Sequence, residues 1–253
     1  AMSALKSGAD LAHIFCAKSA AIAIKAYSPE VIVHPVFTLS TDIEHEVSNE
    51  DLQHMHNQWL DSINSWKNAI TGWVVGPGLG RDKHMDTFFP KLVRNFHKDS
   101  LIVFDADGIF YLCQYPHLFE ELGKNHRVIL TPNHKELGYL KKHLKFELND
   151  TTEENGKEDI IRLDKCSYDY GFNILVKGEH DYYLTKKGCY KITARGGQKR
   201  CGGIGDILAG STIACASWSY DLGPLLSCWL TKKATRVAFN KERRGMTAPS
   251  VLS

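Results

Sequence analysis

The sequence lacks a long apolar run and has no excess of charge of either sign. No uninterrupted apolar stretch approaches the roughly 18 residues that a membrane-spanning helix needs. The 31 Lys and Arg residues nearly balance the 29 Asp and Glu residues, for a formal net charge of +2. This balance excludes the strongly basic surface typical of proteins that bind duplex nucleic acid or anionic membranes. We therefore expect a soluble protein whose partners are neither nucleic acids nor membranes.

Disulfide, metal-binding and export patterns are also missing. The 7 cysteines are an odd number without a C-x-x-C pair, which excludes a secreted disulfide framework and a structural zinc site. The 12 histidines include no H-x-x-H or H-E-x-x-H motif, so we expect no protein-built transition-metal site. The N-terminus shows no pattern typical of a signal peptide. We expect a cytoplasmic protein, or a mitochondrial one if a transit segment is missing from this chain.

The composition and the apolar pattern predict a globular α/β protein. Hydrophobic residues make up 43% of the chain and charged residues 24%, which are ordinary values. Short β-branched runs that are apolar on both faces are typical of parallel strands covered by helices on two sides. Such runs occur at residues 31–33, 73–75, 101–104, 128–130 and 174–176. We predict a single domain over residues 1–253, with three α-β-α layers around an open, mostly parallel sheet.

Segments whose apolar residues have helical spacing lie between these runs. The clearest helix is predicted at residues 50–66, where Ser48 and Asp51 resemble an N-terminal capping box. The most polar part of the chain, residues 141–165, predicts a solvated loop followed by a surface helix.

The C-terminal half predicts a hairpin followed by two helices. Residues 182–184 and 190–192 have the pattern of two strands joined by a short turn. Small and apolar residues then predict helices from Gly205 to Trp218 and from about Leu222 to Asn240.

Polar or glycine-rich residues follow four of the predicted strands. In open α/β sheets, ligands bind beyond the carboxyl ends of the strands, so these segments are candidate binding sites. The four segments are residues 76–82 (GPGLGRD), 105–108 (DADG), 131–136 (TPNHKE) and 177–181 (KGEHD). The first misses the dinucleotide fingerprint G-x-G-x-x-G and is equally compatible with a tight strand-to-helix turn.

The other segments also admit structural interpretations. Asp107 suits a ligand contact, but it also suits an N-cap for a helix that begins near Ile109. Asn133 and Glu136 suit a hydrated Mg²⁺ ion, and they equally suit a helix capping box. Lys177 is suited to contact a phosphate group or the edge of an adenine. It is equally suited to a solvent-exposed position where a hairpin begins. These alternatives remain open from the residues alone.

The most specific pattern is GGQKRCGGIGD at residues 196–206, directly before a predicted helix. Free backbone N–H groups and the positive end of the helix dipole predict an anion hole for a transferring phosphoryl group. Lys199 and Arg200 are expected to neutralise phosphate oxygens, and Asp206 is expected to accept the proton of an attacking hydroxyl. A purely structural loop would account for Asp206 as a helix-dipole residue, but not for the glycines around a basic pair.

Together these motifs resemble the ribokinase-like superfamily, and within it the NAD(P)H-hydrate dehydratases, in particular their ATP-using eukaryotic form. The likeness covers the whole chain and includes residues 244–249 (RGMTAP), which look like the family's closing segment. The G-x-G-D helix start is common to the superfamily, whereas KRCGGIGD and GPGLGRD are more specific. Family members begin with a strand, a Gly-rich turn and an aromatic residue, a portion that we expect to be missing from this chain.

The resemblance implies ATP-dependent dehydration of S-NADHX and S-NADPHX to NADH and NADPH, with release of ADP and phosphate. It implies that Asp206 is the catalytic base and that Mg²⁺ binds together with ATP. Assembly of this chain into a homo-oligomer is compatible with the resemblance. The residues that it assigns to the hydrated nucleotide are Gly78, Gly80, Asn133, His134, Lys135, Glu136, Leu137, Gly138, Tyr139 and Asp206. The residues that it assigns to ATP are Lys177, Gly178, Glu179, His180, Asp181, Gly196, Gly197, Gln198, Lys199, Arg200, Cys201, Gly202, Gly203, Ile204 and Gly205.

Two alternative functions share part of this pattern. A ribokinase-like kinase that phosphorylates a vitamin-precursor alcohol would share Asp206 and the anion hole. It is not expected to combine them with the loop at residues 76–82 and the basic pair at 199 and 200. A non-catalytic nucleotide-binding module would bind ATP without turnover. A stable phosphorylated alcohol as product would identify the kinase, whereas regenerated NADH absorbance would identify the dehydratase.

Overall fold

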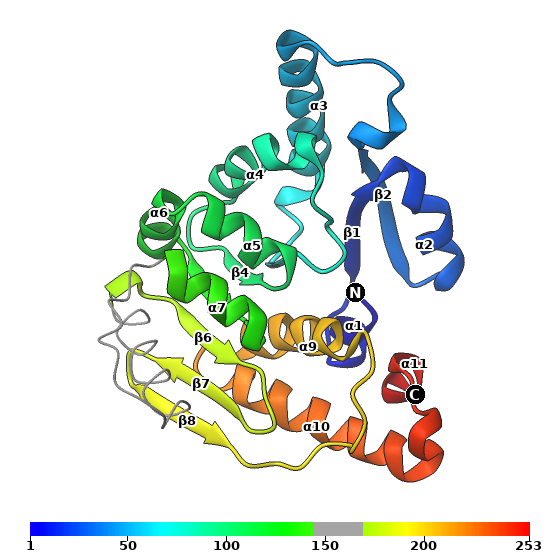
Figure 1. The fold of residues 1–253 in the computed structure, drawn as a ribbon, viewed down its shortest axis with the longest axis vertical. Helices are drawn as coiled ribbons and strands as arrows, with labels where there is room; N and C mark the ends of the chain where they lie inside the picture. Colours follow the sequence, from blue (N-terminus) through cyan, green and yellow to red (C-terminus); the bar gives the residue numbers. More distant parts are fainter. Residues whose placement is uncertain (144–168) are drawn as a thin grey trace.

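The computed structural model describes residues 1–143 and 169–253 (Figure 1). The loop and surface helix predicted within residues 141–165 lie, from residue 144 onward, outside the described residues. Within the described residues, no helix combines the length and the apolar character needed to cross a lipid bilayer.

A six-stranded sheet forms the centre of the molecule. Its strand order is β3-β4-β5-β6-β7-β8, with β3 to β6 mutually parallel and β7 and β8 antiparallel to their neighbours. The strands are β3 (Gly72–Val75), β4 (Leu101–Phe104), β5 (Arg127–Leu130), β6 (Asn173–Val176), β7 (Asp181–Thr185) and β8 (Gly188–Ile192). The mostly parallel sheet and the C-terminal hairpin are therefore confirmed.

A second, two-stranded sheet lies beside the first (right in Figure 1). Its parallel strands, β1 (Ala12–Ala17) and β2 (Val31–Phe37), are joined through a short 3₁₀ turn and α2 (Ala21–Tyr27). The run at 31–33 is thus a strand, but it pairs with β1 and not with the central sheet. The sequence does not predict β1, because AHIFCA contains one β-branched residue and gives a weak local strand signal.

Helices cover both faces of the central sheet, so the three-layer α-β-α prediction is confirmed (Figure 1). One face carries α3 (Asn49–Lys67), α4 (Lys83–Asn95), α5 (Asp107–Gln114), α6 (His117–Asn125) and α7 (His134–His143). The other face carries α1 (Met2–Lys6), α9 (Ile204–Trp218) and α10 (Gly223–Glu242), with α11 (Ala248–Leu252) at the C-terminus. Helices α9 and α10 match the two predicted closing helices within two residues.

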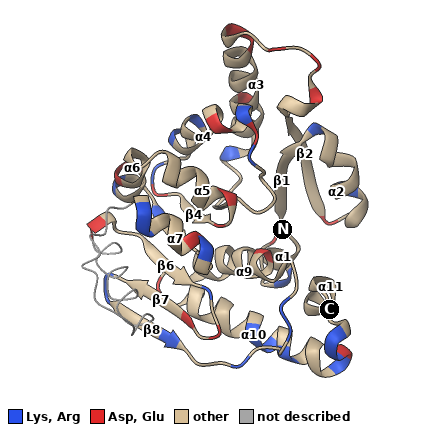
Figure 2. Cartoon of the chain, in the orientation of Figure 1, with Lys and Arg blue, Asp and Glu red and all other residues tan. Residues whose placement is uncertain are grey.

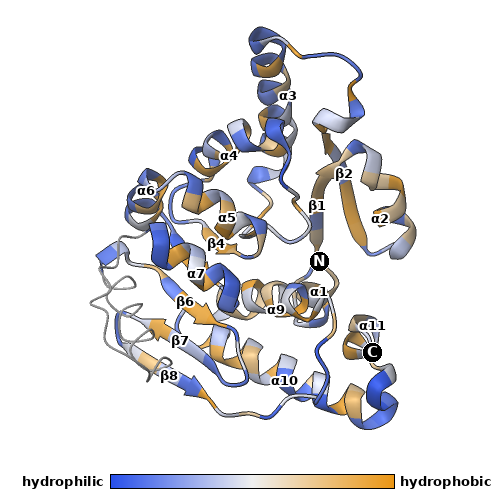
Figure 3. Cartoon of the chain, viewed as in Figure 1, coloured by the Kyte–Doolittle hydropathy of each residue, from blue (hydrophilic) through white to orange (hydrophobic). Residues whose placement is uncertain are grey.

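Strand β4 shows how the sequence builds two cores. Its four residues are fully buried, and successive side chains point to opposite faces of the sheet. Ile102 and Phe104 pack under α4 to α7, whereas Leu101 and Val103 pack against α9. In Figure 3 the apolar colour predominates on most strands of the central sheet, whereas the helices alternate between hydrophilic and hydrophobic colour.

The predicted cap of α3 is confirmed. The Ser48 hydroxyl accepts a hydrogen bond from the backbone N–H of Asp51 at 3.1 Å and donates one to the Asp51 carboxylate at 2.6 Å. The serine therefore satisfies one of the free N–H groups at the start of the helix.

β3, β4 and β5 end at the same level, and β6 runs two residues further. Val75 lies opposite Phe104, Phe104 opposite Leu130, and Leu130 opposite Ile174. The segments that follow β3, β4, β5 and β6 therefore leave the sheet along one edge, where the polar motifs were predicted.

Candidate functional site

An ammonium group held between carboxylates lies at this edge. The Lys177 Nζ atom lies 2.5 Å from Asp105 Oδ1 and 3.7 Å from Glu136 Oε2. The Asp105 side chain is 1% exposed and that of Lys177 is 16% exposed. The segments that follow β4, β5 and β6 thus each contribute one charged group to a largely buried cluster.

Asp206 lies next to this cluster, in the first turn of α9. A Cβ atom placed on the preceding residue, Gly205, would lie 3.6 Å from Lys177 Nζ. Partial burial raises the pKa of Asp206, nearby Asp105 raises it further, and Lys177 lowers it. The carboxylate remains exposed to solvent. A carboxylate whose pKa lies above its ordinary range and that a substrate can reach is suited to act as a general base.

Gly203 shapes the entrance to α9. It is the N-cap residue and has a φ of 86°, a left-handed conformation that favours glycine. The backbone N–H groups that follow it lie at the positive end of the helix dipole, as expected for an anion site. Cys201, Gly202 and Ile204 flank this turn, with Gly202 exposed and the other two half-buried.

Asn133 and Glu136 form the predicted capping box of α7. The Asn133 side-chain oxygen accepts hydrogen bonds from the N–H groups of Lys135 and Glu136, and Glu136 Oε2 accepts one from the Asn133 N–H at 2.9 Å. Burial raises the pKa of Glu136, and Lys177 lowers it. The same pair thus caps the helix and supplies one wall of the charged cluster.

The remaining predicted residues of α7 divide between surface and core. His134, Lys135 and Gly138 are exposed, whereas Leu137 is 5% exposed and packs in the core under α5. Tyr139 is half-buried, with its ring edge-on to Phe110.

Asp107 does not cap its helix as one interpretation predicted. Helix α5 begins at Asp107, two residues before the predicted start, and Ala106 is the N-cap residue. The Asp107 carboxylate instead accepts hydrogen bonds from the Gly80 N–H at 3.2 Å and from Arg81 Nε at 3.0 Å. It therefore holds the glycine loop of residues 76–82 against α5.

Aromatic residues support the same loop. The Arg81 guanidinium lies 3.8 Å from the centre of the Phe110 ring, and the Tyr111 hydroxyl donates to the Gly80 carbonyl at 3.1 Å. Gly78 and Gly80 have φ values of 68° and 74°. A Cβ atom on either would have no described atom within 4 Å, so the loop presents an open backbone face.

The segments predicted to bind ATP are both attached to α10. Lys232 contacts the segment 178–181, and Thr235 contacts Gly197. A Cβ atom on Gly197 would lie 2.5 Å from the Thr235 carbonyl oxygen, so the close packing of the loop on α10 requires a glycine here. The sequence does not reveal Lys232 or Thr235, because polar residues within a helix carry no signal of a distant loop.

Lys199 has protein partners in this structure. Its Nζ atom donates to the carbonyl oxygens of Arg244 and Met246, both at 2.6 Å. The predicted anion loop is therefore tied to the closing segment of the chain. Gln198 and Arg200, on either side, are exposed.

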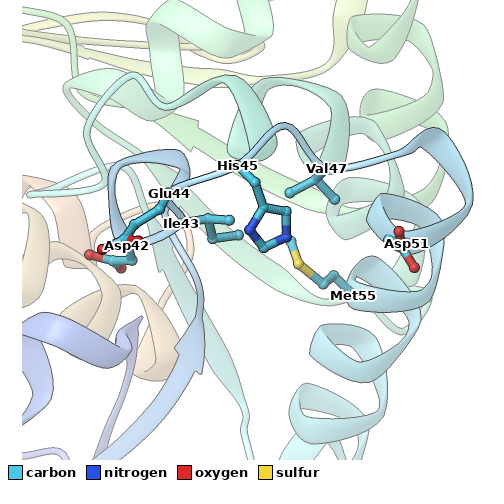
Figure 4. Close-up of a pocket in the computed structure, with 7 residues that line it drawn as sticks. All are labelled: Asp42, Ile43, Glu44, His45, Val47, Asp51 and Met55. Atoms are coloured by element: carbon cyan, nitrogen blue, oxygen red, sulfur yellow. The ribbon is translucent and has the colours of Figure 1, made fainter.

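A hollow elsewhere on the molecule is separate from this site. A cavity of about 480 Å³ lies between the segment 42–47 and α3, lined by Asp51 and Met55 on the helix (Figure 4). No predicted site residue lines it.

Figure 2 shows acidic and basic residues on many elements, in keeping with the balanced composition.

The family model described as NAD(P)H-hydrate dehydratase matches residues 1–253. The chain belongs to the NAD(P)H-hydrate dehydratase family. A curated relative, the ATP-dependent (S)-NAD(P)H-hydrate dehydratase of Rattus norvegicus, is 32% identical over 266 residues, covering 100% of this chain and 71% of the relative.

Solved structures show the same fold. A ribokinase-like superfamily protein from Enterococcus faecalis matches with a TM-score of 0.67 at 17% identity, over 99% of this chain and 76% of that one. An ADP/ATP-dependent NAD(P)H-hydrate dehydratase from Bacillus subtilis, co-crystallised with ATP and Mg²⁺ and soaked with CoA, matches with a TM-score of 0.63 at 17% identity, over 99% and 81%. The ribokinase-like fold predicted for this chain is confirmed.

Proposed function

We propose that this chain is an ATP-dependent dehydratase of S-NADHX and S-NADPHX, acting as a single domain over residues 1–253. The observation that carries the proposal is the position of Asp206. Its carboxylate lies at the N-terminus of α9, beside the Lys177–Asp105 pair. Family membership supports this activity over that of a vitamin-precursor kinase.

The first chemical step is transfer of the γ-phosphoryl group of ATP. Asp206 accepts the proton of the substrate's C6 hydroxyl, whose oxygen attacks the γ-phosphorus while ADP leaves. The N–H groups that follow Gly203 stabilise negative charge on the transferring group, and the Lys177 ammonium acts electrostatically on Asp206.

The second step is elimination of phosphate. Phosphate is a much better leaving group than hydroxide, and the lone pair of the ring nitrogen helps to break the C6–O bond. Loss of the C5 proton to the departing phosphate or to water then restores the C5–C6 double bond of the dihydronicotinamide. The residues of the site therefore need only position the ring and neutralise the charge on phosphate, because the ring nitrogen itself drives the breaking of the C6–O bond.

Mg²⁺ would enter with ATP. Asp105 and Glu136 face the Lys177 ammonium, and no three acidic, His or Cys side chains of the described residues are grouped to hold a metal ion, so the phosphate oxygens of ATP would hold Mg²⁺. The ion would neutralise phosphate charge.

The open backbone of Gly80, with Arg81 and Tyr139 nearby, would face the hydrated nucleotide.

The proposal is tested by incubating the chain with ATP, Mg²⁺ and each hydrate while following NADH or NADPH absorbance. We expect Asp206→Asn to keep ATP binding and to lose about 10²- to 10⁴-fold in turnover, the usual contribution of a general base. Asp221→Asn, which removes a surface carboxylate paired with Lys187, is the matched control and should behave as the wild type. Unchanged turnover in Asp206→Asn would remove that residue from the mechanism. A stable phosphorylated vitamin precursor would support the kinase instead.

A further inference from the structure

The Lys232 ammonium contacts three polar groups of one short loop, residues 178–181. Its Nζ atom donates to the carbonyl oxygens of Gly178 at 3.1 Å and Glu179 at 2.9 Å, and it lies 3.3 Å from Asp181 Oδ2. The ammonium thus donates two hydrogen bonds to the loop and makes a close ion pair with its aspartate. The side chains of Lys232 and Asp181 are 12% and 7% exposed, which shields the contact from water.

Asp181 completes the loop from the other side. Its Oδ1 atom accepts a hydrogen bond from the Gly178 N–H at 3.0 Å, while its Oδ2 atom faces Lys232. The carboxylate therefore closes the turn that follows β6, and the ammonium fixes that closed turn to α10.

Thr235 holds a second loop from the same face of α10. Its hydroxyl accepts a hydrogen bond from the Gly197 N–H at 3.1 Å and donates one to the Lys232 carbonyl at 2.8 Å. Residues three apart lie on one face of a helix, so Lys232 and Thr235 form a single contact surface. Gly196 also lies against it, because a Cβ atom there would be 3.0 Å from Thr235 Oγ1.

One turn of α10 thus joins two segments, 178–181 and 196–197, that the proposed function places around ATP. We propose that Lys232 and Thr235 are positioning residues of the ATP site, which keep these two segments at a fixed separation. The inference rests on the proposed function for the identity of the ligand. Backbone groups that are already held in place need little ordering when the nucleotide binds, which favours affinity.

The test compares Lys232→Met and Thr235→Val with the wild type. Methionine keeps much of the length of lysine but loses its donors, and valine keeps the shape of threonine but loses the hydroxyl. Lys233→Met is the matched control, because this neighbouring ammonium lies 5.6 Å from the Trp229 ring on α10. Two quantities are measured: the Kd of a non-hydrolysable ATP analogue with Mg²⁺ by calorimetry, and the KM for ATP and for S-NADHX during turnover.

We expect Lys232→Met to raise the Kd of the analogue and the KM for ATP roughly 10- to 100-fold, the usual cost of losing charge-assisted contacts or misplacing a binding group. Thr235→Val should raise both by a smaller factor, whereas the KM for S-NADHX should change less than threefold. A purely structural role would lower the melting temperature without separating the two KM values. Folded Lys232→Met and Thr235→Val proteins with wild-type Kd values would overturn the inference.

The two proposals fail in different ways. If the wild type binds the analogue but does not convert either hydrate, the dehydratase proposal is wrong, and the Kd comparison still decides the role of Lys232. If the wild type does not bind the analogue at all, both proposals are wrong. If Lys232→Met does not fold, Thr235→Val decides whether α10 positions the ATP site, because this variant removes only one hydroxyl.

Discussion

Replacing Lys177 with methionine tests whether the charged cluster at the sheet edge contributes to stability. Lys177→Met keeps much of the side-chain length but removes the only cation that the structure places on Asp105 within the described residues. Asp105 is 1% exposed, so its carboxylate would remain buried without a partner. Breaking a buried ion pair by removing one member typically costs about 3–5 kcal/mol, because the other charge is left uncompensated.

This cost predicts a large change in thermal stability. For a domain of this size each kcal/mol shifts the melting temperature by about 2–4 °C, so Lys177→Met should melt roughly 6–20 °C below the wild type. The double variant Lys177→Met/Asp105→Asn should recover most of the loss, since it removes the unpaired charge as well. The measurement is thermal and urea unfolding without nucleotide, so that ligand binding does not contribute.

Lys187→Met is the matched control. Lys187 is also paired with an aspartate, Asp221, but that pair lies on the surface with side chains 69% and 44% exposed. Exposed ion pairs contribute little to stability, so this variant should melt close to the wild type. The reasoning would be refuted if Lys177→Met unfolded at the wild-type temperature, or if the double variant were no more stable than Lys177→Met.

Two further predictions concern Asp206 and the glycines of the segment 196–206. Only the ionised Asp206 accepts a proton, so kcat/KM for the hydrate should fall as the pH drops through the raised pKa of this residue. The acid limb of the pH–rate profile should therefore lie above the ordinary pKa of 3.8. A limb at or below that value would contradict the prediction. Gly197→Ala should destabilise the protein by about 1–3 kcal/mol in urea unfolding, because its Cβ would lie 2.5 Å from the Thr235 carbonyl oxygen. Gly202→Ala, where no described atom lies within 4 Å of the added Cβ, should unfold like the wild type, and equal losses in both variants would argue against the packing explanation.

Features set by neighbouring residues were predictable from the sequence. The caps at Ser48 and Asn133 involve contacts within three residues, and the hairpin involves strands joined by two residues. The buried strands were predictable for a similar reason, because a run of β-branched residues that is apolar on both faces suits a sheet covered on two sides. β1 was missed because its stability comes from pairing with β2 and not from its own composition.

The partners of the site residues were not predictable in the same way. Asp107 was expected to cap a helix or meet a ligand, yet it binds a loop that lies 27 residues earlier in the chain. Lys199 was expected to face phosphate, and it contacts carbonyl groups 45 and 47 residues later. Such contacts leave no periodic pattern in the sequence.

The sequence by itself determined the alternation of strands and helices, the polar segments at the strand ends and the glycine-rich start of α9, because each depends on local spacing. Only the tertiary structure decided that Lys177 meets Asp105, 72 residues away, and that α10 joins two distant loops. The physical reason is that parallel strands in register bring their carboxyl ends to one edge whatever their separation along the chain. Which charges then meet at that edge depends on the packing of helices across the sheet.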